Sequence, residues 1–254
     1  MEHQNQKPSL NYGFKPDIIE VNKDYIYGGF TKVPELELQV DGNWISYLPT
    51  KEIQNLNNIE TYACVAFTIL NCVEMLIKRQ YNEERNYSDR FLAAVSGTKE
   101  GGNQHNVVCE FLRKIGVVPE EIWTFDSTIN TFDKFYEKIP PKLYELARDF
   151  NREWDFKHEF VPNNSELIRR ALKSSPLGVS VPAWYERNGK YYRPEGVAEN
   201  HFTTLIKEDV VFDSYDSIIK ELEPMSHSSI KRFYIKKLST PPLVSWWQKV
   251  FNIF

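Results

Sequence analysis

Residues 64–78 read CVAFTILNCVEMLIK, an apolar run that contains neither glycine nor proline. The run is long for a strand, and its apolar residues fall on nearly every helical face, which predicts a buried helix. Thr61 is the expected N-cap, because a hydroxyl at that position can accept a hydrogen bond from the first turn. Cys64 would then be the third residue of a long central helix.

Amphipathic patterns predict further helices in the first two thirds of the chain. From about residue 106 to residue 115, Val108, Leu112 and Ile115 share one stripe, and Gly116 is placed to end the helix. Helical spacing of apolar residues, or an Asn/Ser cap, also predicts helices at residues 131–139, 142–154 and 165–173.

The chain becomes rich in strands after Pro176. An Asn188-Gly189 pair between tyrosines is a strong signal for a tight hairpin. Short apolar runs predict further strands at residues 177–181, 202–206, 210–212 and 230–238. A helical first half followed by a strand-rich second half predicts an α+β fold of two lobes, with an antiparallel sheet or barrel in the second.

Three segments of the chain differ in character. Residues 1–50 form an irregular leader interrupted by prolines, in which residues 36–40 and 44–48 alternate loosely and suggest extended pieces. We expect this leader to wrap over a core domain at residues 51–240 and not to form a separate domain. Because it precedes the candidate nucleophile, as propeptides do, it could also cover the cleft as a built-in inhibitor.

The last segment, residues 241–254, is unusually aromatic. After two prolines it could form a short amphipathic helix with Trp247, Val250, Phe251 and Phe254 on one side. Such a helix could dock on its own domain or on a partner protein. Attraction to a membrane surface would be weak, because the segment carries a single lysine.

The composition excludes several classes of function. The 254 residues carry a net charge of −4 and no Lys/Arg cluster, so nucleic acid is not an expected partner. Three cysteines are too few for a disulfide framework, residues 1–10 lack the apolar run of a secretory signal, and no stretch suits a membrane span. These features predict a cytoplasmic protein, and a virion-associated protein assembled inside a cell would share them. No metal or phosphate-loop motif occurs, so no cofactor is expected.

Cys64 has the position that a nucleophilic cysteine needs. Unpaired backbone N–H groups and the positive end of the dipole at a helix start favour the thiolate, which is the reactive form. The alternative is that Cys64 is a small core residue, which is the interpretation that we give to Cys72 and Cys109 in mid-helix.

A base and an orienting group follow in the strand-rich half. His201 begins a predicted strand and could face a cleft, while a hairpin turning near residues 207–209 brings Asp213 back to its level. Cys64, His201 and Asp213 would then form a Cys-His-Asp set in which Asp213 orients the imidazole. As a strand-end residue, Asp213 could instead serve only the turn. The other histidines are expected to be exposed bystanders: His3, His105, His158 and His227.

The chain from about residue 50 to residue 220 resembles the papain-like cysteine peptidases. In that family a cysteine opens the central helix, a Gly-Gly loop precedes a second helix, and a histidine starts a strand before an Asn-Ser-Trp element. The matching elements here are Ala63-Cys64-Val65-Ala66-Phe67, Tyr87-Ser88-Asp89-Arg90, Gly101-Gly102-Asn103, Gly116-Val117-Val118 with Trp123, Leu177–Val181, Asn200-His201 and Asp213-Ser214-Tyr215. The resemblance implies a papain-like fold with the Cys-His-Asp set as its catalytic triad. The general character of the chain is also similar to that of cell-wall hydrolases encoded by bacteriophages, which use the same arrangement of a helix cysteine and a strand histidine.

The resemblance leaves the donor to the oxyanion open. The family's Gln-Gly-x-Cys-Gly-Ser-Cys loop is absent, and the position six residues before Cys64 holds Asn58. Gln54, ten residues before the cysteine, has a longer side chain and could serve if the loop is longer. The resemblance therefore implies either Gln54 or Asn58 as the partner of the Cys64 backbone N–H.

The predicted function is a cysteine peptidase that cleaves amide bonds of a polypeptide through a thioester on Cys64. A peptidoglycan stem-peptide hydrolase or a transamidase would use the same residues. An inactive papain-like fold that serves as a structural or adaptor protein, docked through its aromatic tail, is the alternative from another class.

Overall fold

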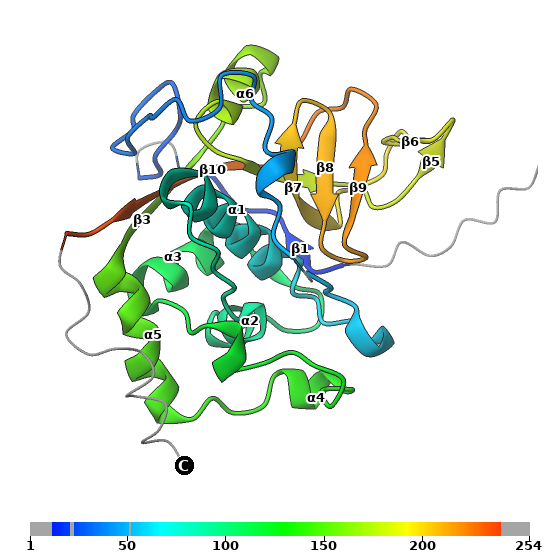
Figure 1. Cartoon of the computed structure of the whole chain (residues 1–254). Coiled ribbons are helices and arrows are strands. Elements are labelled where there is room, and N and C mark those ends of the chain that lie inside the picture. Colours follow the sequence, from blue (N-terminus) through cyan, green and yellow to red (C-terminus); the bar gives the residue numbers. More distant parts are fainter. Residues whose placement is uncertain (1–11, 21–22, 51, 240–254) are drawn as a thin grey trace, which may run out of the picture.

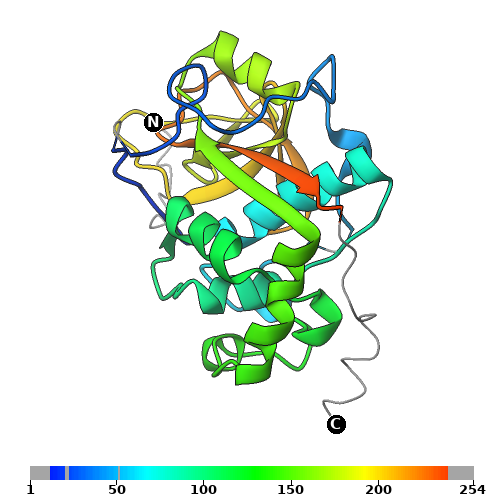
Figure 2. The same ribbon diagram turned by 90° about the vertical axis from the view of Figure 1, so that its left-hand side faces the viewer.

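The computed structural model describes residues 12–20, 23–50 and 52–239. The described chain contains six α-helices and a six-stranded antiparallel sheet, so the expected α+β class is confirmed. Helix α1 (Cys64–Tyr81) lies in the middle, with helices α2 to α5 on one side and strands β7 to β9 on the other (Figure 1). The view turned by 90° shows the same division into a helical part and a sheet part (Figure 2).

The start of helix α1 differs from the sequence prediction. Ala63 is the N-cap residue and makes no side-chain cap hydrogen bond, so Cys64 is the first helical residue and not the third. Thr61 cannot cap the helix, because Tyr62 adopts a left-handed conformation (φ 53°) that turns the chain between Thr61 and the helix. The Thr61 hydroxyl instead donates to the backbone oxygen of Gln54 (3.4 Å).

The remaining helices largely follow the predicted pattern. The C-cap of helix α3 (His105–Ile115) is Gly116, and the side chain of Asn164 caps α6 (Ser165–Leu172) by accepting hydrogen bonds from two backbone N–H groups. The predicted helix at residues 131–139 is only the short α4 (Phe132–Phe135), because Tyr136 leaves the helical conformation before Pro140 and Pro141. Pro141 opens the next helix, α5 (Pro141–Glu153), and the sequence prediction missed α2 (Asp89–Val95).

The sheet has the strand order β3-β10-β4-β7-β8-β9, and all its neighbours are antiparallel. Its strands are β3 (Trp154–Phe160), β4 (Leu177–Val181), β7 (His201–Lys207), β8 (Val210–Asp213), β9 (Ile218–Glu221) and β10 (Ile230–Lys237). Strands β3 and β9 were not predicted. Strand β3 follows α5 without an intervening turn, so no local signal separates the two elements.

Two small pairs of strands lie outside the six-stranded sheet. Strand β1 (Phe14–Lys15) runs parallel to β2 (Asn103–Gln104), and β5 (Glu186–Arg187) forms the predicted hairpin with β6 (Lys190–Tyr191). Elsewhere in the leader the expected extended pieces are wrong. Residues 45–47 form a 3-10 turn, and residues 36–40 form no strand.

The leader contributes directly to the packed core. The indole N–H of the fully buried Trp44 donates to the Leu172 oxygen (2.7 Å), and its backbone N–H donates to the Ile206 oxygen (2.8 Å). Tyr27 is buried and pairs through its backbone N–H with the Phe160 oxygen (2.8 Å).

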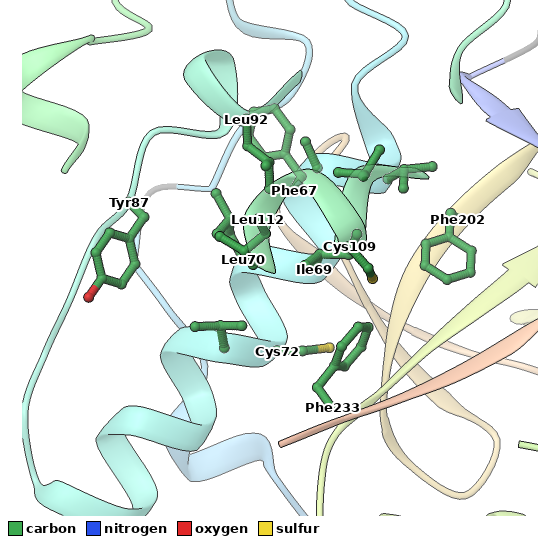
Figure 3. Close-up of a cluster of buried hydrophobic side chains, with 14 of the residues drawn as sticks. Phe67, Ile69, Leu70, Cys72, Tyr87, Leu92, Cys109, Leu112, Phe202 and Phe233 are labelled. Carbon is green, nitrogen blue, oxygen red and sulfur yellow. The ribbon is translucent and has the colours of Figure 1, made fainter. Parts of the chain in front are cut away.

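Helix α1 holds the two parts together through its buried faces. Cys72 of α1 lies beside Phe233 of strand β10, and Cys109 and Leu112 of α3 complete the same cluster (Figure 3). Burying each large apolar side chain contributes about 1.5–3 kcal/mol relative to exposure. The predicted core role of Cys72 and Cys109 is therefore confirmed. Among the described helices, none combines the length and the apolar character that a bilayer span requires.

Candidate active site

His201 and Asp213 form a buried hydrogen-bonded pair. The imidazole Nε2 of His201 lies 2.7 Å from Oδ1 of Asp213, and neither side chain is exposed to solvent. The other ring nitrogen, Nδ1, is buried and has no hydrogen-bond partner among the described residues. The arrangement thus leaves Nδ1 as the ring nitrogen that can exchange a proton with a reacting group.

The strand register explains why these two residues meet. Thr204 of strand β7 pairs with Phe212 of β8, which places Asp213 one position further, opposite Thr203. His201 lies two residues from Thr203 and therefore points to the same face of the sheet. The pair is thus a diagonal contact across neighbouring strands.

A lysine that the sequence analysis did not identify also binds Asp213. The Nζ atom of Lys220, on strand β9, lies 2.6 Å from Oδ2 of Asp213 and 2.6 Å from Oδ1 of Asp216. Burial acts to raise the pKa of Asp213, but His201 and Lys220 together hold that pKa well below its usual range. Asp213 is therefore a carboxylate with two charge-assisted hydrogen bonds, and no local motif marked Lys220 in advance.

Aromatic side chains from three separate segments surround the imidazole. Ring centroids lie 5.3 Å from His201 for Tyr12, 5.6 Å for Trp184 and 6.3 Å for Tyr215, all near edge-to-face. The Trp184 ring also lies 4.8 Å from the Lys220 ammonium. These rings exclude water from the His201–Asp213 pair, which strengthens its electrostatic interaction.

Cys64 lies beside the strand that carries His201. The hydroxyl of Thr68, one turn along α1, donates to the backbone oxygen of Phe202 (2.9 Å), which joins the start of the helix to the start of β7. Burial raises the pKa of the Cys64 thiol well above its usual range, although backbone hydrogen bonds with Phe202 and Val65 oppose the shift. Desolvation of the fully buried sulfur thus opposes the thiolate that the helix start was expected to favour, and it has the larger effect on this pKa.

The two candidate oxyanion donors occupy different surroundings. Gln54 is fully buried, its backbone N–H donates to the Ser214 oxygen (2.7 Å), and its side-chain amide donates to the Tyr12 oxygen (3.3 Å). Asn58 is exposed at the end of a short turn, with a left-handed φ of 56°. The structure thus brings Gln54, and not Asn58, to the site. Gln54 binds Tyr12, whose ring contacts His201, and Ser214, which follows Asp213 in the chain.

Part of the leader lies directly against this site. The backbone N–H of Tyr12 donates to the oxygen of Asn200 (3.0 Å), the residue before His201, while the Tyr12 oxygen accepts the Gln54 amide. The main chain of Tyr12 therefore joins Gln54 to the residue that precedes His201. A leader over the cleft was expected from the sequence, but the residues that make this contact were not, because the two segments meet only in the folded chain.

Of the described histidines outside the site, His105 and His227 are buried and His158 is half-buried, so their expected exposure is wrong. His105 Nδ1 lies 2.8 Å from Oδ2 of Asp17, and its Nε2 contacts the hydroxyl of Ser229. His158 pairs with Glu110 (3.1 Å), and His227 Nδ1 pairs with the Ser180 oxygen (2.7 Å). Each polar tip finds a partner inside the fold, which a lone histidine in a sequence does not reveal. His3 lies outside the described residues. Within the described ranges, no three His, Cys, Asp or Glu side chains could hold a metal ion.

Comparisons with known proteins identify the fold. No family model matches the sequence, and a search of curated proteins gives no match. Among solved structures, xylellain, a cysteine protease from Xylella fastidiosa, is 16% identical, covers 90% of this chain and 97% of its own, and has a TM-score of 0.58. The bromelain protease from Ananas comosus, in complex with the E64 inhibitor, is 19% identical over 75% of this chain and 96% of its own, with a TM-score of 0.56. Digestive procathepsin L 3 of Tenebrio molitor is 10% identical over 88% of this chain and 76% of its own, with a TM-score of 0.55.

The chain has the fold of the papain-like cysteine proteases, as its resemblance to that family implied. At 10–19% identity the likeness concerns the fold and not the activity. The same structures give no support to a bacteriophage origin.

Proposed function

We propose that the protein is a cysteine peptidase in which Cys64 is the nucleophile, His201 the acid and base, and Asp213 the group that orients the imidazole. One observation carries this proposal. Asp213 holds His201 through Nε2 and leaves Nδ1 unpartnered, at the strand start that hydrogen bonds join to the helix bearing Cys64. A cysteine protease needs this combination of an oriented base and a nearby thiol.

The geometry supports a two-step acyl transfer. His201 takes the thiol proton through Nδ1, and the sulfur attacks the carbonyl carbon of an amide. The carbon–nitrogen bond breaks, the amine leaves with the proton from His201, and the acyl group remains on Cys64 as a thioester. Water then attacks the thioester, gives its proton to His201 and releases a carboxylic acid and the free thiol.

Gln54 is the proposed donor to the oxyanion, together with the backbone N–H of Cys64. Its side-chain amide already binds one peptide carbonyl oxygen, that of Tyr12, so it is able to bind the carbonyl of a substrate. A polypeptide is the proposed substrate. A peptidoglycan stem peptide, or an amine in place of water, would use the same residues.

The leader is proposed to hold this site closed. Tyr12 covers the imidazole and occupies the amide of Gln54, and the Cys64 sulfur is fully buried with a raised pKa. Withdrawal of Tyr12 would uncover the imidazole and free the donor. Reactivity of Cys64 should therefore depend on the leader.

Alkylation of the three cysteines by iodoacetamide tests the proposal. The rate at each cysteine is measured from pH 5 to 9 by peptide mass mapping, in the wild type and in Tyr12→Ala, each with and without His201→Ala. We expect Cys64 of Tyr12→Ala to react well below the free-thiol pKa of about 8.5, and to lose this reactivity with His201→Ala. The buried Cys72 and Cys109 are internal controls for unfolding.

An inactive binding protein is the second candidate. The full burial of Cys64 and the raised pKa of its thiol favour it. Slow alkylation of all three cysteines in every variant, indifferent to His201, would support this candidate and reject the peptidase.

A further inference from the structure

The main chain at Gly13 passes through a gap that has no room for a side chain. A Cβ atom added to Gly13 would lie 2.2 Å from the backbone oxygen of Tyr62 and 2.4 Å from its carbonyl carbon. The φ angle of Gly13 is 112°, a conformation that residues with an L side chain rarely adopt. Both the space and the backbone conformation therefore require glycine at this point.

Gly102 forms a second wall of the gap. A Cβ atom on Gly102 would lie 1.7 Å from the Gly13 oxygen, and the N–H of Asn103 donates to that same oxygen (2.9 Å). The wall atoms on both sides are main-chain atoms, so the gap cannot widen by a change of rotamer. Tyr62 N–H is fixed by the Glu60 carboxylate (3.0 Å) and Gly102 N–H by the Lys99 oxygen (2.8 Å). We call this gap between Tyr62 and Gly102 the glycine slot.

Aromatic residues flank the slot on both sides. Tyr12 packs its ring against His201, its backbone N–H donates to the Asn200 oxygen, and its backbone oxygen accepts the Gln54 amide. Phe14 is buried, with its ring stacked 5.5 Å from the ring of Phe202. The occupied site therefore accepts the sequence aromatic–glycine–aromatic, with the two rings held in separate places.

We propose that the glycine slot is a specificity site, so that the polypeptides bound beside Cys64 carry a glycine between two aromatic residues. This inference rests on the proposed function, because it assigns a substrate class to the same site. The leader fills the slot in the closed state, and an external segment of the same chemistry takes its place when the leader withdraws. Alanine or any larger residue at the central position is excluded by main-chain atoms.

The full chain with Gly13→Ala provides the test, because its own leader no longer fits the slot. We expect alkylation of Cys64 by iodoacetamide to rise by about tenfold or more, equivalent to at least about 1.4 kcal/mol of lost protection. Gly28→Ala is the matched control. Gly28 lies in the same leader with a left-handed φ of 74°, but an added Cβ would meet only the end of the Leu167 side chain at 3.3 Å. Its Cys64 should react as in the wild type.

Two synthetic peptides then measure selectivity in Gly13→Ala. One has the sequence of residues 10–17, LNYGFKPD, and the other carries alanine in place of its glycine. We expect the glycine peptide to slow alkylation of Cys64 by about tenfold at saturation, and the alanine peptide to have no effect. Gly102→Ala, added to Gly13→Ala, should abolish protection because it closes the slot from the other wall.

The outcomes separate this inference from the proposed function. Equal protection by both peptides, or by neither, overturns the glycine selectivity while a His201-dependent Cys64 remains in place. A Cys64 that reacts no faster than Cys72 and Cys109, and is indifferent to His201, overturns the peptidase itself. If Gly13→Ala does not fold, Tyr12→Ala releases the ring contact without a clash, and the same two peptides decide the question in that variant.

Discussion

His201 and Lys220 bind the two oxygens of one carboxylate. Oδ1 of Asp213 lies 2.7 Å from the imidazole, and Oδ2 lies 2.6 Å from the ammonium. Asp213 therefore has two separable tasks. It fixes the orientation of the imidazole, and it neutralises a lysine that is buried in the sheet.

The first task predicts the effect of Asp213→Asn. The amide keeps the size of the side chain but loses the charge that stabilises a protonated His201, so Cys64 alkylation in Tyr12→Ala should slow by about a hundredfold. The matched control is Asp216→Asn, which removes the negative charge of the other acceptor of Lys220 (2.6 Å). Equal slowing in the two variants would mean that Lys220, and not orientation of His201, controls reactivity.

The second task predicts a loss of stability in Lys220→Met. Asp213 would lose one buried charge-assisted hydrogen bond, which should lower the free energy of unfolding by about 2 kcal/mol in urea titrations. Lys190→Met is the control, because Lys190 and its partner Glu221 are mostly exposed and 3.4 Å apart. That variant should stay within about 0.5 kcal/mol of the wild type.

Two carboxyl groups in the helical part, those of the buried Glu52 and the half-buried Glu120, predict how stability depends on pH. Burial raises the pKa of Glu52 and of Glu120 to about 7. Each group binds its proton more tightly in the folded chain, so its stabilising effect is complete below about pH 4 and is lost as the pH rises through about 7. The free energy of unfolding should therefore fall between about pH 5 and 8, by at most about 3 kcal/mol per group.

Glu52→Gln tests this dependence. In this variant the free energy of unfolding should decline less steeply between about pH 5 and 8, because one of the titrating groups is gone. The control is Glu121→Gln, at an exposed neighbour of Glu120, which should keep the wild-type slope. The depressed pKa of Asp213 acts below about pH 4 and does not overlap this range. Identical slopes for wild type and Glu52→Gln would show that Glu52 does not titrate there.

Trp44 predicts that the leader is part of the stable fold. Trp44→Ala removes a fully buried ring and its hydrogen bond to Leu172, and should lower the free energy of unfolding by about 3–5 kcal/mol. Phe30→Ala is the control within the leader, because Phe30 is 56% exposed. A leader that only rests on a finished domain would instead tolerate both substitutions equally.

Elements with strong local patterns could be predicted from the sequence. Helix α1 was predicted from an unbroken apolar run, and β7 and β8 from two apolar runs around a short charged turn. Strand β3 could not be predicted, because it continues from α5 without any turn residue, and its partner β10 lies far along the chain. Strand β9 is short and has two exposed isoleucines, so its pattern did not indicate a strand.

Some features of the candidate site could likewise be predicted from the sequence, and others could not. The sequence alone determined that Cys64 stands at a helix start and that a hairpin brings Asp213 back toward His201, because helix and hairpin geometry depend on residues near in the chain. Only the tertiary structure decided that Gln54, and not Asn58, reaches the site, that Lys220 shares Asp213, and that Tyr12 covers the imidazole. It also decided the raised pKa of the Cys64 thiol. Contacts between distant segments and the loss of water around a buried group arise from packing, which local sequence patterns do not specify.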